Sequence, residues 1–174
     1  MLSLTQIQKH FQARRYEPLV EAVLANGLPL PAGLRLRLAQ SPVAAVGLGL
    51  RRLVELTYGP TATSRSMAAW LVEQQAGDGS FDGDPLATAV AAAALAAVSR
   101  EQPTLGDPAV GFAHERAVTA LAAMQRPDGR FASPADRDHD QRAVVSAFVL
   151  LLLQDDDLFT QSARLGDLLD TLDD

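Results

Sequence analysis

Three acidic side chains lie close together in the run Asp136-Arg137-Asp138-His139-Asp140. Carboxyl groups crowded in this way disfavour one another's charge, so that a buried one can stay protonated and serve as a general acid. The neighbouring side chains Arg137 and Arg142 favour the charged form instead. The competing interpretation is a solvated loop in which Asp138 or Asp140 caps the N-terminus of the following helix.

A metal site would have to combine carboxylates with one of the three histidines, because the chain contains no cysteine. His139 lies beside Asp138 and Asp140, but adjacent residues rarely all face one ion. We therefore predict no metal and no cofactor. A second acidic stretch, Asp82-Gly83-Asp84-Pro85, precedes another apolar segment. Asp84 directly before Pro85 is typical of a helix cap, and we interpret it as structural.

The strongest pattern in the chain is a short sequence motif that occurs twice. The segment from Gln75 to Phe81 recurs from Gln125 to Phe131, 50 positions later, with Gln, Asp, Gly and Phe in register. We call each copy a clasp; the matching residues are Gln75, Asp78, Gly79 and Phe81 in the first and Gln125, Asp128, Gly129 and Phe131 in the second. Asp-Gly breaks a helix and forms a turn, because glycine adopts positive φ at little cost. We expect the Phe ring to fold back on the helix and the Gln amide to bind the open end of a neighbouring helix.

Each clasp joins two helical segments of different character. The segment before it is amphipathic, with Arg65 and Glu73 in the first and residues 114–116 in the second. The segments after it, 87–98 and 143–153, are apolar all round, which predicts helices buried on every side. A half-exposed helix paired with a buried helix suggests two layers, with the apolar helices inside.

This pattern resembles the α/α-toroid proteins, which include protein prenyltransferases, terpenoid cyclases and the thioester-containing toroids. Their repeats end an outer helix with Gln, a few residues, Gly, one residue and an aromatic; Gln75, Gly79 and Phe81 match, as do Gln125, Gly129 and Phe131. The cyclases usually carry Trp at the last position. The resemblance covers roughly residues 60–155 and implies an all-α fold of inner and outer helices, here as a partial or miniature toroid.

The resemblance also implies where chemistry would lie. Protonating cyclases carry Asp-x-Asp-Asp before Thr-Ala; Asp136 and Asp138 match the first two acids, whereas the third is displaced to Asp140 and Arg142-Ala143 replaces Thr-Ala. The zinc ligand set of prenyltransferases includes Cys, which this chain lacks. The triple 155–157 lacks the spacing of an Asp-Asp-x-x-Asp diphosphate site, and we expect it in a loop at a helix end.

Composition narrows the class of protein. Hydrophobic residues make up 48% of the 174 residues and aromatic residues 5%, a bias that favours packed helices over sheets. The net charge is −6, without the basic stripe of a nucleic-acid-binding protein. The apolar run 143–153 is far shorter than the ~20 residues of a membrane span. No signal peptide is recognised, and we expect a cytoplasmic protein.

We expect one helical domain over 1–174, with N-terminal helices in 1–57, two toroid-like repeats in 58–155 and a C-terminal helix in 156–174. We predict eight or nine helices in all. Outside the repeats, a first helix ends near Arg15, three further helices span 18–26, 32–39 and 42–56, and a last helix follows a cap at Thr160. A complete toroid has about a dozen helices. The open edge of this shorter array would be covered by a protein partner or by another copy of the chain.

Two functions remain open at this stage. The first is a non-catalytic module that binds a protein partner or an apolar ligand, with candidate contacts Trp70, Leu95, Phe148 and Leu152. The alternative is a prenyltransferase-like or terpenoid cyclase-like enzyme acting on an isoprenoid, with Asp136, Asp138 and Asp140 as its acids. Six Phe, two Tyr and one Trp are few for a cavity that stabilises carbocations, which favours the binding module.

Overall fold

The computed structural model describes residues 4–25, 27, 29–57, 59–101, 107–133 and 136–172. Within these ranges the protein is all-α, as predicted, with ten helices and no strand. The helices are α1 (Leu4–Gln12), α2 (Tyr16–Leu24), α3 (Ala32–Gln40), α4 (Pro42–Leu56), α5 (Ala62–Gln74), α6 (Pro85–Glu101), α7 (Pro108–Ala123), α8 (His139–Leu153), α9 (Asp157–Ser162) and α10 (Leu165–Leu172). None of the described helices has the length and apolar character needed to cross a membrane.

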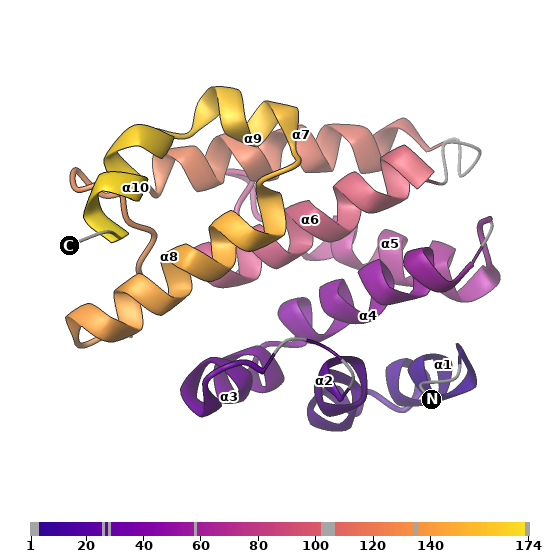
Figure 1. Ribbon diagram of the computed structural model, residues 1–174. Coiled ribbons are helices and arrows are strands. Elements are labelled where there is room, and N and C mark those ends of the chain that lie inside the picture. Colours follow the sequence, from indigo (N-terminus) through magenta and orange to yellow (C-terminus); the bar gives the residue numbers. More distant parts are fainter. Residues whose placement is uncertain are drawn as a thin grey trace.

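The helices form two layers (Figure 1). Helices α4, α6 and α8 pack side by side in one layer, and α5, α7 and α9 lie along the other, with α5 on α4 and α7 on α6. Helices α1, α2 and α3 cover the remaining side of α4. The first residues of α4, α6 and α8 line one common cavity. The last turn of α4 lies beside that of α8 in a second cavity and beside that of α6 in a third, so these three helices run in the same direction.

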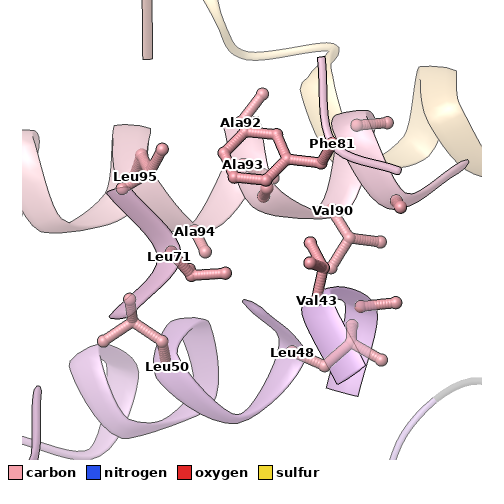
Figure 2. Close-up of a cluster of buried hydrophobic side chains, with 14 of the residues drawn as sticks. Val43, Leu48, Leu50, Leu71, Phe81, Val90, Ala92, Ala93, Ala94 and Leu95 are labelled. Carbon is pink, nitrogen blue, oxygen red and sulfur yellow. The ribbon is translucent and has the colours of Figure 1, made fainter. Parts of the chain in front are cut away.

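The centre of the core lies between α4, α5 and α6, where Leu50, Leu71 and Leu95 are fully buried (Figure 2). Helix α4 approaches α6 closely because it carries glycine at position 47. A Cβ atom there would lie 2.8 Å from Cγ1 of Val90 and 3.3 Å from the Val90 carbonyl oxygen. A side chain at this position would therefore push the two helices apart.

The two clasps have the same internal structure. Glycine is required in both turns, since φ is +91° at Gly79 and +81° at Gly129. The N–H of the next residue donates to the preceding aspartate, from Ser80 to Asp78 at 2.9 Å and from Arg130 to Asp128 at 3.1 Å. The Ser80 hydroxyl also donates to Asp78. This bond is the main cause that holds the pKa of Asp78 below its ordinary value, and the bond from the Ser80 N–H is the second cause.

Each clasp is joined through its glutamine to a segment that follows later in the chain. Gln75 donates from Nε2 to the Gly79 carbonyl of its own turn at 3.0 Å and to the Ala113 carbonyl of α7 at 2.8 Å. Gln125 donates in the same way to Gly129 at 2.7 Å and to Arg164, directly before α10, at 3.1 Å. The expected contact with an open helix end holds for Gln125, because its Oε1 also accepts from the N–H of Arg164 at the start of α10 at 2.8 Å. It is wrong for Gln75, whose partner carbonyl lies inside α7, because the turn of the first clasp rests against the side of that helix.

A buried hydroxyl fastens each clasp to the apolar helix that follows. The N–H of Phe81 donates to Oγ1 of Thr88 at 3.0 Å, and the N–H of Phe131 donates to Oγ of Ser146 at 2.9 Å. All four side chains are fully buried. The two hydroxyls stand 7 and 15 residues after their Phe, since the second connection is longer. Sequence spacing alone did not reveal this equivalence.

Only one of the two apolar helices is buried on every side. Helix α6 is buried along nearly its whole length, as predicted. The prediction is wrong for α8, where Ala147 is exposed and Leu151 is 42% exposed. The reason is position: α6 has α4 on one side and α8 on the other, whereas α8 is the last helix of its layer.

Other expectations need correction at the chain ends. Helix α1 stops at Gln12 rather than near Arg15, and α2 begins at Tyr16, two residues before Pro18. The C-terminal segment forms two helices, and Thr160 lies inside the first of them. The cap of α9 is Asp156, whose Oδ1 accepts from the N–H of Phe159 at 3.0 Å. The acidic triple thus begins a helix, with its middle residue as cap, rather than lying in a loop.

Asp156 also joins α9 to α7, since its Oδ2 lies 2.6 Å from Nε2 of His114. Burial by itself raises the pKa of Asp156, but the hydrogen bonds from His114 and Phe159 outweigh it and hold the pKa below the usual 3.8. The adjacent Phe159 ring is fully buried, with its centre 6.0 Å from that of Phe131. The short helix α9 therefore covers the aromatic residue of the second clasp.

The clasp turn predicts a large difference between two neighbouring glycines. In Gly79→Ala, the new Cβ would lie 2.5 Å from the Arg116 carbonyl oxygen of α7, in a backbone conformation that disfavours side chains. We expect urea unfolding to show a loss of about 2 kcal/mol or more. The control Gly77→Ala, with no neighbour within 4 Å and no positive φ, should change stability by less than about 0.5 kcal/mol. Equal losses in the two variants would contradict the close contact between clasp and helix.

The contact between His114 and Asp156 predicts a pH dependence of stability. Because the pKa of Asp156 is lower in the folded chain than in the unfolded chain, its contribution is complete above the usual value of 3.8 and is lost as the pH falls through the folded value. The free energy of unfolding should thus be higher for the wild type than for Asp156→Asn at pH 7, and the difference should shrink below pH 3.8. A difference that stays constant down to pH 2.5 would be inconsistent with this linkage.

Candidate functional site

A cavity of ≈ 740 Å³ lies at the first turns of α4, α6 and α8, facing α3. We call it the acidic cavity. Its charged lining residues are Arg37, Asp82, Asp84, Asp136, Asp138 and Asp140. Its apolar floor consists of Pro31, Leu34, Pro42, Ala87, Val144 and Val145. All three sequence-predicted acids therefore line one cavity, together with the acidic stretch of the first repeat.

The arginine of this cavity, Arg37, holds the two repeats together. Its guanidinium donates Nη1 to Asp136 and Nη2 to Asp84 at 3.1 Å. Nη2 also lies 3.2 Å from Oγ of Ser133. The side chain of Asp136 is 1% exposed, so that this carboxylate depends on Arg37 for compensation of its buried charge. Sequence reasoning missed Arg37, because its partners stand 47 and 99 positions away.

Each of the three predicted acids has a different environment. Both carboxylate oxygens of Asp136 accept hydrogen bonds, one from Arg37 and the other from the N–H of Ser133 at 2.7 Å. Asp138 is the cap of α8 and accepts from the N–H of Gln141 at 2.7 Å. Asp140 is fully exposed, with His139 at 4.0 Å. Asp84 combines the two roles, since it caps α6 by accepting from Ala87 at 3.0 Å and also pairs with Arg37.

The buried carboxylate of the acidic cavity acts as a hydrogen-bond acceptor and not as a proton donor. A general acid must present a protonated oxygen to the substrate, whereas the two oxygens of the buried Asp136 are occupied by N–H donors. The basic neighbours are also in use, since Arg142 donates from Nε to the Asp136 carbonyl at 3.2 Å. Among the described residues, no three His, Asp or Glu side chains are grouped so that they could hold a metal ion.

A second cavity, of ≈ 370 Å³, lies farther along α4 and α8, where α2 also lines it. We call it the apolar cavity. Its walls carry Val23, Leu24, Leu30, Leu48, Phe148, Leu151 and Leu152, with Arg51, Arg52, Glu55 and Asp155 also in the lining. Glu55 lies 2.8 Å from Arg52 and 3.7 Å from Arg51. The two cavities follow one another along α8, from Val144 to Leu152, a rise of about 12 Å for eight residues.

Two of the four predicted ligand contacts, Phe148 and Leu152, line the apolar cavity. Trp70 and Leu95 belong to the lining of neither cavity. Leu95 is fully buried in α6, and Trp70 packs against the core from α5, in the other layer. The alanines of α6 let its neighbours pack tightly, so the open space lies between α4 and α8 instead.

Comparison of the chain with family models, with curated proteins and with solved structures finds no match.

The network around Arg37 predicts that this residue stabilises the fold. In Arg37→Met, the carboxylate of Asp136 would stay buried without its cation, and we expect a loss of about 2 kcal/mol in the free energy of unfolding. The control is Arg35→Met on the same helix, whose ion pair with Glu21 is exposed and should contribute less than about 1 kcal/mol. Similar stabilities of the two variants would mean that Asp136 does not depend on Arg37.

Proposed function

We propose that this chain is a non-catalytic helical module of the α/α-toroid kind, which binds an apolar ligand between α4 and α8. The observation that carries the proposal is the open apolar wall of α8. Phe148, Leu151 and Leu152 face a cavity there, although α8 belongs to the layer whose other helices are covered. An apolar surface left open beside a cavity is typical of ligand sites, and the two volumes lie within or near the usual range for small molecules.

The clasps support the relation to toroid proteins. Both copies make the same turn, the same glutamine bonds and the same bond from Phe to a buried hydroxyl. Each copy ends a helix of one layer and leads into a helix of the other, α5 into α6 and α7 into α8. This repeated unit is what a module built from toroid hairpins requires.

The acidic cavity supports binding rather than reaction. The alternative, an enzyme acting on an isoprenoid, needs a loop acid that can donate a proton. Asp136 pairs with Arg37, and Asp138 and Asp84 cap helices, which accounts for three of the acids as structural groups. The six Phe residues also contribute little to the cavities, since Phe148 is the one aromatic side chain in the described linings.

Leu151→Lys tests the proposed binding site without disturbing the core, because Leu151 is 42% exposed. The pure protein would be titrated with an apolar fluorescent dye, and we expect affinity to fall about tenfold when this leucine becomes charged. The matched control is Leu169→Lys on α10, which is 49% exposed and outside both cavities.

Equal dye binding by the wild type and Leu151→Lys would contradict the proposed site. Size-exclusion chromatography at several protein concentrations tests whether the chain self-associates. Self-association that Leu151→Lys abolishes would mean that a second copy, rather than a ligand, covers α8.

A further inference from the structure

The apolar cavity and the acidic cavity adjoin each other along α8. Leu30 lines the apolar cavity, and Pro31, the next residue of the chain, lines the acidic cavity. On α8, Val145 lines the acidic cavity and Phe148, about one turn later, lines the apolar cavity. Apolar side chains therefore lie at the boundary between the two spaces, and side chains can change rotamer to join them.

Helix α8 presents one apolar strip to both cavities. The strip begins with Val144 and Val145 in the acidic cavity and continues with Phe148, Leu151 and Leu152 in the apolar cavity. The spacing i, i+1, i+4, i+7 and i+8 places all five residues on one face of the helix. The strip is about 12 Å long, the rise of eight helical residues. A compact ligand would fill one cavity and leave the strip in the other cavity uncovered.

The polar side chains that α8 contributes to the two linings lie at opposite ends of this strip. Asp138, Asp140 and Gln141 come before it, and Gln154 and Asp155 come after it. Between positions 141 and 154, the described lining residues of α8 are all apolar. An occupant that follows the strip therefore meets polar groups at its two ends and apolar surface along its middle.

A peptide does not suit this middle section. An extended peptide would leave its N–H and C=O groups without partners there, because the side chains are apolar and the backbone groups of α4 and α8 are bonded within their helices. An α-helix satisfies its own backbone, but at a diameter of about 10 Å it occupies roughly 400 Å³ per turn. One turn is thus larger than the whole apolar cavity of ≈ 370 Å³. A hydrocarbon chain is narrower and has no backbone groups to satisfy.

We propose that the space between α4 and α8 binds one unbranched aliphatic chain, which lies along the apolar strip through both cavities. The proposal rests on the proposed function and specifies the shape and chemical class of its ligand. Each methylene that the strip covers contributes to affinity by leaving water, so a chain that reaches both cavities gains over one that reaches a single cavity.

The experiment measures displacement of the apolar dye by 1-hexanol, 1-octanol and 1-decanol, and by cyclodecanol, which has as many carbon atoms as 1-decanol. We expect affinity to rise about fourfold for each added methylene up to 1-decanol, the factor for transfer of one methylene out of water. 1-Decanol should bind at least about tenfold more tightly than cyclodecanol, because the ring cannot extend into both cavities.

Val144→Lys tests whether the chain reaches the acidic cavity. Val144 is partly exposed in that cavity, about two turns from Leu151, and a lysine would occupy this end of the strip. Binding of 1-hexanol, which the apolar cavity can hold alone, should stay within about twofold of wild type, whereas 1-decanol should bind about tenfold more weakly. The control Val72→Lys makes the same change at a partly exposed position of α5 outside both cavities, and it should leave the whole alcohol series unchanged.

The outcomes separate this inference from the proposed function. Equal binding of 1-decanol and cyclodecanol, or unchanged 1-decanol binding in Val144→Lys, overturns the chain inference, and the apolar ligand site stands if Leu151→Lys still weakens dye binding. Failure of the dye and of every alcohol to bind overturns the proposed function as well. A dimer that both Leu151→Lys and Val144→Lys abolish, and that 1-decanol does not dissociate, would mean that a second copy covers the strip and would overturn both. Should Val144→Lys not fold, the comparison of 1-decanol with cyclodecanol on the wild type decides the question.

Discussion

The arrangement of the helices depends on how closely each clasp turn can approach the helix that it contacts, α7 for the first and α10 for the second. The first turn touches the backbone of α7 at Arg116, and the second touches α10 at Asp167 and Leu168, so that neither leaves room for a Cβ atom. Backbone contact of this kind sets the distance between helices more strictly than side-chain packing does, because side chains can adopt other rotamers. The glutamine amide then satisfies carbonyl groups on both sides of the contact, and each hairpin is held in a defined position relative to the next.

A partly buried charge network lies directly after the two clasps, at the first turns of α6 and α8. Arg37 comes from the N-terminal helices, whereas Asp84 and Asp136 come from the loops that lead into α6 and α8. The network thus connects α3 to the loops that precede α6 and α8. Such a network gives the acidic loop a structural role, since removal of one partner would leave buried groups without compensation.

The position of α8 at the edge of its layer explains both its exposed face and the cavities beside it. Helix α6 is enclosed by α4, α7 and α8, and its alanines leave no space between them. Within its layer, helix α8 has a neighbour on one side only, so that apolar residues on its other side line the cavities shared with α2 and α3. Apolar residues exposed beside a cavity are the feature on which the proposed binding role rests.

The sequence by itself determined the local structure: the all-α class, the two clasps, the bounds of α4 and the cap at Asp84, since these depend on residues within one or two turns of each other. It also predicted that α6 is buried, because a helix that is apolar on every side favours packing all round. Tertiary structure alone decided that α8 is half-open, since its sequence is just as apolar as that of α6 but it lies at the edge of the layer. It alone paired Arg37 with Asp136, and Phe131 with the hydroxyl of Ser146. Those contacts join residues far apart in the chain, and only the packed helices bring them within hydrogen-bonding distance.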